Sequence, residues 1–382
     1  MDNVSVTGQT GTSKLTFTDV PDDKTVEQFA EELDVKKDEE EQAKAKEEQA
    51  AIDEMVKNSN GGTEQMLKGL HERVDKKLMD NFQIITSRVR WVDPDKKTIL
   101  WLHDLPWDPE AAHIKDEQSR DRFDKFICVS NWQMQMYNTV LGLPYKDSLV
   151  LPNAIDPIEF DPDSLKGDSD ENIETRIVRL KDELIENDEI NLIYHTTPHR
   201  GLELLVPVFI ELAKTYKQIH LHVYSSFEVY GWGQRDEPYK KLFDICEEHD
   251  QITYYGYQPR DVVIEQLKKT HIFAYPSIWQ ETSCLSAIEA MSAGCNIVAP
   301  NYGALPETMA NFGYTYQYSE DPQEHCHRFG AALTAVLDNL ISTENRQWVI
   351  GAGMASKRFV DRHYDWSERA RQWTILLESL MR

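Results

Sequence analysis

The sequence predicts an α/β protein with two domains, each built on a parallel sheet. Strand–loop–helix–strand units recur along the chain, and the clearest has apolar strands at 271–276 and 296–300 with a helix between them that ends at Gly294. The predicted strands are continuous apolar runs, as expected of parallel strands that are covered on both faces. A length of 382 residues suits two or three domains.

The overall composition narrows the class of protein. The net charge of -25 argues against non-specific binding to nucleic acid or to an anionic membrane surface. The five cysteines are scattered without a C-x-x-C pair, which fits a reducing cytosol, and no apolar run approaches the ~18 residues of a membrane span. We therefore expect a cytoplasmic protein without a transmembrane segment and without direct nucleic-acid binding.

The first 57 residues differ from the rest of the chain. They are polar and acidic, with a low-complexity run at 36–51, and only Val26, Phe29 and Leu33 form a weak apolar stripe. Such a composition predicts an acidic extension, 1–57, that is a solvated helix or disordered. The alternative is a helix that binds a partner, so self-association through this extension is a second hypothesis.

The predicted first domain covers 58–157. It opens with a turn that contains Gly61 and Gly62, two residues that let the backbone approach a ligand but also suit an ordinary linker. A helix is expected at 65–79. Four strands and one further helix follow: strands at 82–86, 98–103, 125–130 and 148–151, and the helix at 131–141.

His103 ends the second of these strands. In open α/β sheets, a side chain at the carboxyl end of a buried strand points into the ligand crevice. The alternative is a structural histidine that is hydrogen-bonded within its loop. The segment 152–156 then predicts a hinge between the domains.

The predicted second domain covers 158–364. Its first strand, 190–194, is followed by Arg200, whose guanidinium fork could bind a diphosphate, and by a helix at 202–216. Strands at 219–224 and 252–256 and a helix at 260–269 come next. The last segment, 365–382, has the apolar stripe of a helix that packs back on the domains, formed by Ala370, Trp373, Leu376, Leu377 and Leu380.

The stretch from Glu281 to Gly294 predicts a ligand site. Thr282 and Ser283 are good N-cap residues, and the free N–H groups of a helix start suit a phosphate. Glu281 is expected in the loop at the mouth of the site and Glu289 about two turns into the helix. Two carboxylates beside an anion site need neutral hydrogen-bond donors, and sugar hydroxyls are such donors.

The spacing Glu281-x7-Glu289, followed by Ala-Met-Ser-Ala-Gly, resembles the signature of family-4-type retaining glycosyltransferases. These enzymes have the GT-B fold, in which two Rossmann-like domains face each other across a cleft. Other segments resemble the family in the same order, namely 61–64, 129–132, 152–156, 199–205, 275–277, 303–307 and the helix at Trp366. The resemblance covers about 58–380.

Two departures from the family pattern stand out. The family's first strand, which usually comes directly before the glycine loop, is missing, so we expect a shortened first domain. His195 stands where many members have arginine. Charge compensation of a diphosphate would then depend on Arg200 and the helix start.

The resemblance implies a role for each matching residue. Arg200 neutralises the diphosphate, Glu281 binds hydroxyls of the donor sugar, and Glu289 binds the ribose. Backbone N–H groups of Thr282, Ser283 and Cys284 lie near sugar and phosphate. Tyr257 flanks the base. Gly61, Gly62 and His103 lie on the acceptor side, with His103 close to the reacting sugar, so that His103, Arg200 and Glu281 are the catalytic candidates.

The implied activity is a retaining hexosyltransferase that uses a nucleotide diphosphate sugar and an unknown acceptor, which could be a glycan, a lipid or a protein. No metal and no other cofactor is expected, because the D-x-D patterns at Asp93, Asp161 and Asp168 occur by chance in so acidic a chain. Two alternatives stay open: a GT-B epimerase or phosphorylase, and a degenerate protein that binds a nucleotide sugar or a partner without catalysis.

Overall fold

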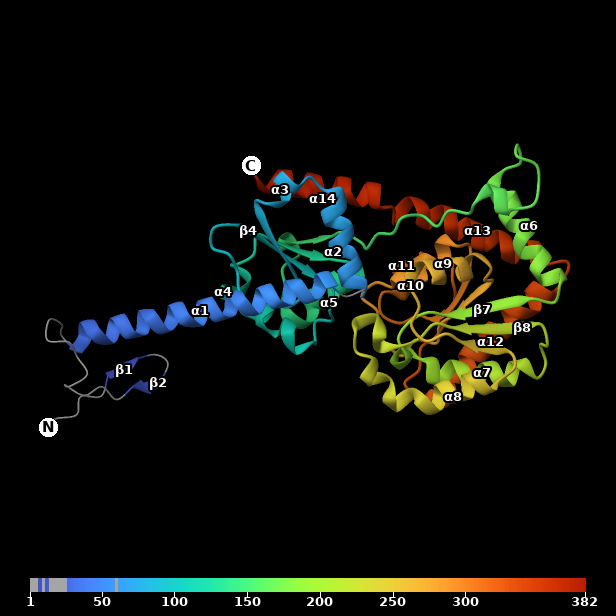
Figure 1. Cartoon of the computed structure of the whole chain (residues 1–382), viewed down its shortest axis with the longest axis horizontal. Helices are drawn as coiled ribbons and strands as arrows, with labels where there is room; N and C mark the ends of the chain where they lie inside the picture. The colour runs from blue at the N-terminus through green and yellow to red at the C-terminus, as the bar shows by residue number, and fades with distance from the viewer. Residues whose placement is uncertain (1–5, 9–10, 14–25, 59–60) are drawn as a thin grey trace.

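Two parallel sheets form the body of the protein, as predicted. The structure is a computed structural model and describes residues 6–8, 11–13, 26–58 and 61–382. Figure 1 shows the two sheets side by side, each with helices packed against it. The first sheet has the strand order β3-β4-β5-β6, with every neighbouring pair parallel; its strands are β3 (Phe82–Thr86), β4 (Lys97–Leu102), β5 (Lys125–Cys128) and β6 (Ser148–Val150).

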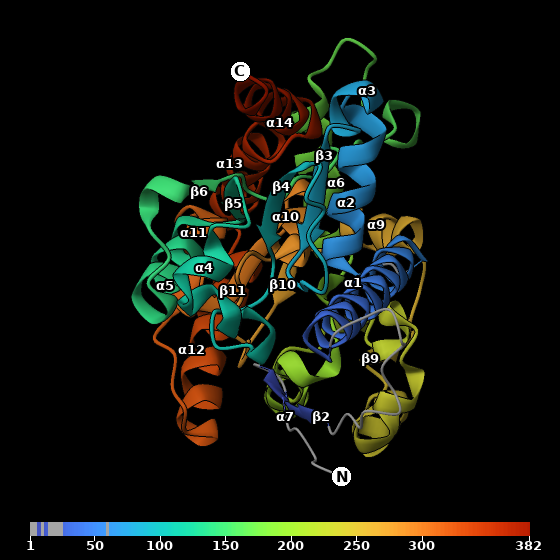
Figure 2. The same ribbon diagram turned by 90° about the vertical axis from the view of Figure 1, so that its left-hand side faces the viewer.

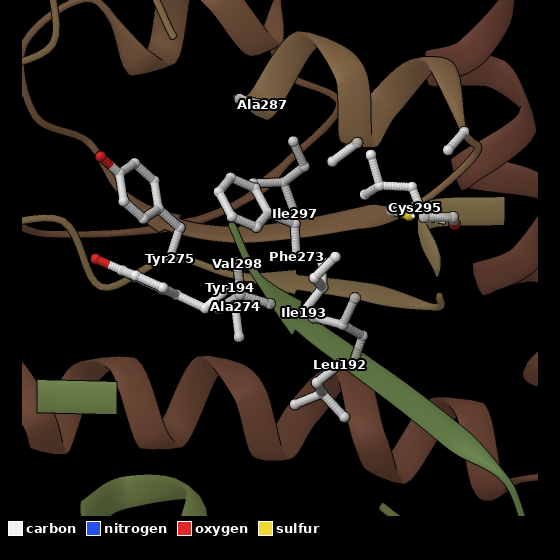
Figure 3. Close-up of a cluster of buried hydrophobic side chains, with 14 of the residues drawn as sticks. Leu192, Ile193, Tyr194, Phe273, Ala274, Tyr275, Ala287, Cys295, Ile297 and Val298 are labelled. Carbon is white, nitrogen blue, oxygen red and sulfur yellow. Dashed lines mark hydrogen bonds between the residues drawn. The ribbon is translucent and has the colours of Figure 1, made fainter. Parts of the chain in front are cut away.

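The second sheet has six parallel strands in the order β12-β11-β10-β7-β8-β9. Its central strands are buried on both faces, and Figure 3 shows the tight packing of Leu192, Ile193 and Phe273 in this core. This burial explains the continuous apolar runs in the sequence. The strands are β7 (Ile190–Tyr194), β8 (Ile219–Val223), β9 (Ile252–Tyr254), β10 (Ile272–Ala274), β11 (Asn296–Pro300) and β12 (Tyr314–Tyr316).

The helices connect the strands in the usual parallel-sheet manner. Those of the first half are α2 (Gly62–Arg73), α3 (Lys76–Met79), α4 (Glu117–Arg120) and α5 (Asn131–Leu141). Those of the second half are α6 (Ile173–Glu186), α7 (Leu202–Ala213), α8 (Lys240–Glu248), α9 (Arg260–Lys268), α10 (Leu285–Ser292), α11 (Leu305–Met309), α12 (Pro322–Ile341) and α13 (Arg346–His363). The chain ends with α14 (Trp366–Leu380).

The last helix, α14, packs on the first sheet although it follows the second in sequence. Trp373 is fully buried against Trp101, with ring centroids 4.8 Å apart. The chain passes from one half to the other near Ile155 and again near Trp366, and these two segments are hydrogen-bonded to each other. Ile155 N donates to Tyr364 O (2.8 Å), and Trp366 N donates to Ile155 O (3.2 Å). The first half is therefore completed by the end of the chain.

The acidic extension contains a long helix, α1 (Val26–Asn58), and a small antiparallel pair, β1 (Val6–Gly8) and β2 (Gly11–Ser13). Gln49 is 2% exposed and anchors α1, because its Oε1 accepts a hydrogen bond from Arg90 N (2.7 Å). The N-terminal part of α1 projects away from the body (Figure 1), and α1 contacts α2, which lies at an angle to it (Figure 2). The side chains of the predicted stripe, Val26, Phe29 and Leu33, lie outside the described residues.

Two helix boundaries differ from the predictions. The helix expected at 65–79 is divided in two, because Val74 is extended and the Asp75 carboxylate caps α3 by accepting from Lys77 N. The first of them, α2, begins earlier than expected, at Gly62, with Gly61 as its N-cap residue. Residues 59 and 60 of the predicted turn lie outside the described part of the chain.

Candidate functional site

A cleft of about 1360 Å³ lies between the two halves. Residues from the carboxyl ends of strands in both sheets line it, as the topology of parallel sheets favours. All of the site residues predicted from the sequence line this cleft: Gly61, Gly62, His103, Arg200, Tyr257, Glu281, Thr282, Ser283, Cys284 and Glu289.

Arg200 and Glu281 meet at the floor of the cleft because they follow two neighbouring strands, β7 and β10. Arg200 Nη1 forms an ion pair with Glu281 Oε1, and Tyr275 Oη donates to the same oxygen (2.5 Å). Glu281 lies in its loop as predicted, but its side chain is buried, at 4% exposed, and does not lie at an open mouth. The site therefore holds a fixed carboxylate with a fixed cation beside it.

Arg200 keeps its charge in this environment. Burial opposes the charge, but the facing Glu281 carboxylate outweighs that effect and holds the pKa of Arg200 well above its usual value. Gly201, with φ 129°, follows directly and lies against the carbonyl oxygen of Pro276, where a side chain would collide. The backbone thus delivers Arg200 into the cleft at a position that only glycine permits.

The helix α10 begins later than predicted. Its N-cap is Cys284, and neither Thr282 nor Ser283 caps it. The Thr282 hydroxyl instead donates to His103 O in the first half (2.9 Å), so a contact across the cleft replaces the local cap. At its other end α10 stops as predicted, since Gly294 has φ 72° and Cys295 N donates to Ala290 O (2.9 Å).

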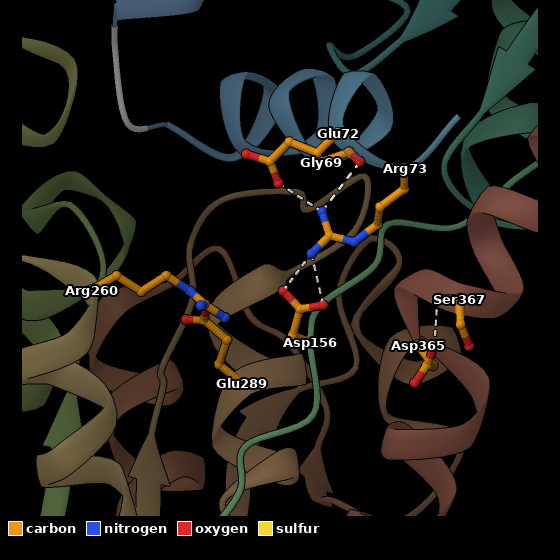
Figure 4. Close-up of polar contacts among 8 residues, drawn as sticks. All are labelled: Gly69, Glu72, Arg73, Asp156, Arg260, Glu289, Asp365 and Ser367. Atoms are coloured by element: carbon orange, nitrogen blue, oxygen red, sulfur yellow. Dashed lines mark hydrogen bonds and ion pairs between the residues drawn. The ribbon is translucent and has the colours of Figure 1, made fainter. Parts of the chain in front are cut away.

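Glu289 lies about one turn into α10 because of this later start. It is 8% exposed and accepts a hydrogen bond from Arg260 Nε (2.6 Å), at the first residue of α9 (Figure 4). Each of the two predicted carboxylates is therefore paired with an arginine. Arg260 was not predicted from the sequence, because nothing in the local pattern indicates a contact with a residue 29 positions away.

His195 is a buried neutral imidazole. Burial lowers its pKa to about 4, so it carries no charge at neutral pH. Burial, with help from Arg200, lowers the pKa of His199 in the same way. Within the described chain, the cations that the second half presents to the cleft at neutral pH are therefore arginines, namely Arg200, Arg235 and Arg260.

His103 faces the cleft from the first half. Its backbone N donates to Ser87 Oγ (2.9 Å), and Ser87 adopts the left-handed region with φ 61°. Burial lowers the pKa of His103 to about 3, and its Nε2 is shielded from solvent without a hydrogen-bond partner in the described chain. A neutral imidazole with one uncommitted nitrogen is suited to hydrogen-bond a ligand hydroxyl.

The glycine turn touches the opposite half. A Cβ on Gly61 would overlap the ring of Tyr230, and one on Gly62 would lie 3.2 Å from Leu285 Cδ1. The missing side chains thus allow α2 to begin directly against the second half. Tyr257 follows Gly256 after β9, lines the cleft and is 37% exposed.

Glu307 forms a second contact between the halves, which was also not predicted from the sequence. Its carboxylate accepts hydrogen bonds from Asn131 N (2.8 Å), Asn131 Nδ2 (2.9 Å) and Trp132 N (2.8 Å), in the first turn of α5. An anion at a helix start is favourable, because it satisfies free N–H groups and complements the helix dipole. Glu307 therefore links the second half to the first turn of α5 in the first half.

Replacing Glu307 by alanine is expected to remove this link between the two halves. The N–H groups of Asn131 and Trp132 lose their acceptor, at a cost of roughly 1–2 kcal/mol by analogy with helix caps. Amide hydrogen exchange at these two residues should accelerate by about tenfold. Glu344→Ala, an exposed site on the second half, is the matched control. Unchanged exchange at Asn131 and Trp132 would show that Glu307 does not restrain α5.

Known proteins share parts of this sequence. Residues 180–346 match the family described as glycosyl transferases group 1. Among curated proteins, the chain is 30% identical over 191 residues to a subunit of phosphatidylinositol N-acetylglucosaminyltransferase from Arabidopsis thaliana, covering 49% of this chain and 36% of that one. It is 23% identical over 249 residues to lipopolysaccharide 1,2-N-acetylglucosaminetransferase of Salmonella typhimurium, covering 64% and 59%. The chain thus spans only about a third to three fifths of these relatives.

Solved structures share the fold. A glycosyltransferase from Rickettsia africae has a TM-score of 0.56 at 14% identity, covering 83% of this chain and 82% of that one. The Anabaena protein HepE in complex with UDP and glucose has a TM-score of 0.55 at 15% identity, covering 74% and 72%. The predicted GT-B fold class is therefore confirmed. None of the helices in the described part of the chain has the length and apolar character of a membrane span.

Proposed function

We propose that this protein is a hexosyltransferase that moves a sugar from a nucleotide diphosphate sugar to an acceptor, with retention of the anomeric configuration. The observation that carries this proposal is the pairing of Arg200 with Glu281 at the ends of neighbouring strands, in a cleft that Glu289 and His103 also line. The group 1 match of residues 180–346 and the solved relative that holds UDP and glucose support it.

The donor would bind mainly to the second half. Its diphosphate would lie between Arg200 and the first N–H groups of α10, where both the charge and the helix dipole favour an anion. Glu281 would accept hydrogen bonds from the hydroxyls of the sugar, and Glu289 from those of the ribose. Tyr257, after the end of β9, would pack beside the base.

The reaction would need charge stabilisation more than acid–base chemistry. As the bond between sugar and diphosphate breaks, negative charge grows on the leaving oxygen, and the fixed guanidinium of Arg200 stabilises it. The acceptor hydroxyl would attack on the same face and pass its proton to the leaving oxygen. His103 Nε2 would hydrogen-bond the reacting sugar. Arg235 and Arg260 add positive charge to the same wall, so we propose that no metal is required.

Nucleotide release tests the proposal. The full chain is incubated with UDP-, GDP- and ADP-sugars and a mixture of glycan, lipid and peptide acceptors, with and without EDTA. We expect release of one nucleotide, unchanged by EDTA, and a product whose anomeric proton shows retained configuration in NMR. Absence of release with every donor and acceptor would favour the non-catalytic alternative.

Donor binding also depends on Glu289 in this proposal. Glu289→Gln keeps the shape but removes the charge, so affinity for the correct nucleotide sugar should fall about tenfold to hundredfold, as for a hydrogen bond to a charged group. Arg260 is 40% exposed and stays hydrated in the variant, so the fold should persist. Isothermal titration calorimetry measures the affinity for the nucleotide sugar, with Glu265→Gln on the protein surface as the control variant. Equal affinities would refute the ribose assignment.

A further inference from the structure

The two walls of the cleft carry opposite charge balances among the described residues. On the second half, three arginines face two carboxylates: Arg200, Arg235, Arg260, Glu281 and Glu289. On the first half, five carboxylates face three cations: Glu64, Glu72, Asp104, Asp108, Asp156, Lys68, Arg73 and Arg88. The second half thus suits the anionic donor of the proposed function, whereas the first half disfavours an anionic ligand.

The cations of the first half are also partly engaged. Arg73 Nη2 donates to both carboxylate oxygens of Asp156 (2.9 and 2.8 Å), and Arg73 Nη1 donates to Glu72 (2.9 Å), as Figure 4 shows. A guanidinium bound to two carboxylates offers little charge to a phosphate. An acceptor with a phosphate or carboxylate next to its reacting hydroxyl would therefore meet net repulsion on this wall.

A tryptophan lies between two of these carboxylates in the sequence. Trp107 is 48% exposed and lines the cleft, and Trp132 supports it edge-on at 6.4 Å between ring centroids. The loop is held at both ends. Asp104 O accepts from Gln133 Nε2 (3.0 Å), and Asp108 caps the following turn by accepting from Glu110 N (2.9 Å). Trp107 is thus a pre-positioned aromatic surface.

The same wall has a buried side-chain oxygen that lacks a partner. Asn153 is 6% exposed and follows β6 at the carboxyl edge of the first sheet. It lines the cleft, and its side-chain oxygen has no hydrogen-bond partner within the described residues. A buried polar atom without a partner is costly, so a ligand that supplies a hydroxyl group would satisfy Asn153 Oδ1.

From these features we infer that the first half binds an uncharged glycan as the acceptor. One sugar ring would pack its C–H face on Trp107, with hydroxyls donating to Asp104 and Asp108. The cleft has room for it, because about 1360 Å³ exceeds the roughly 300–1,000 Å³ of a pocket for one small ligand. That the glycan is the acceptor rests on the proposed function, whereas glycan binding at this subsite does not depend on catalysis.

Direct binding tests the subsite separately from activity. The full chain with UDP is titrated with neutral trisaccharides of glucose, of mannose and of N-acetylglucosamine, followed by saturation-transfer NMR. Vesicles of phosphatidylcholine with phosphatidylinositol, and a sugar phosphate, are the competing probes. We expect binding of a neutral trisaccharide that weakens about tenfold or more in Trp107→Ala, on the scale of one aromatic contact. Trp348→Ala, an exposed tryptophan on α13, should bind normally.

The outcomes separate the two proposals. Trisaccharide binding that depends on Trp107, without binding or release of any donor nucleotide, would overturn the proposed function and leave the glycan subsite standing. Donor binding without any trisaccharide binding, or a preference for the phosphatidylinositol vesicles or the sugar phosphate, would overturn the glycan inference. Equal trisaccharide affinity in Trp107→Ala and Trp348→Ala would also overturn it.

Discussion

Replacing Arg200 by methionine is expected to lower the rate of sugar transfer by about two to three orders of magnitude. That is the usual effect of removing one fixed group that stabilises charge in a transition state. Methionine retains much of the apolar stem, so the loss reports on the guanidinium. Single-turnover kinetics at saturating donor would separate this effect from weaker binding.

The same substitution should also destabilise the fold. Glu281 is 4% exposed, and without Arg200 its carboxylate is a buried charge that retains the hydrogen bond from Tyr275. Breaking a buried ion pair in this way costs about 3–5 kcal/mol. Denaturant unfolding of Arg200→Met would measure the loss, with Arg358→Met on the exposed face of α13 as the control.

A double variant distinguishes the two effects. Arg200→Met combined with Glu281→Gln removes both charges, so most of the lost stability should return, because no unpaired charge is left. Transfer should stay as slow as in the single variant. Recovery of both stability and transfer would mean that Arg200 only compensates Glu281 and does not act on the leaving group.

The Arg200–Glu281 pair shows which part of the site can be predicted from the sequence. The strand-to-helix pattern predicts that each residue lies at the carboxyl end of a strand. It does not predict that β7 and β10 are neighbours, since β8 and β9 come between them in the chain. The resemblance to a family supplied that step. Placing both residues in one cleft therefore needed the family's residue order as well as local periodicity.

The site residues that were not predicted share one property: they contact residues that are distant in the sequence. Arg260 and Glu307 make their contacts with residues 29 and 175–176 positions away, and no local pattern indicates such contacts. The wrong helix start at Thr282 has the same cause. Its hydroxyl is a good cap by residue type, but it donates to His103 O across the cleft. Tertiary partners override local preference at the places where the two halves meet.

The packing of α14 leads to the second large effect. Trp373→Ala should lower the free energy of unfolding of the first half by about 3–5 kcal/mol, the usual cost of truncating a fully buried tryptophan. Trp373 is 0% exposed and contacts Trp101 in the hydrophobic core of the first half, which also contains Leu70 and Ile99. Because the hydrophobic core of the second half contains none of these residues, the loss of stability should be confined to the first half.

Thermal unfolding should reveal this as a separate, earlier transition. In the native chain α14 ties the end of the sequence to the first sheet, so we expect the two halves to unfold together. In Trp373→Ala the first half should melt at lower temperature, while the second half still binds the nucleotide. Trp348→Ala, which removes a tryptophan that is 67% exposed, should change stability by less than about 0.5 kcal/mol. A single unshifted transition in Trp373→Ala would show that α14 contributes little to the first half, despite its buried position.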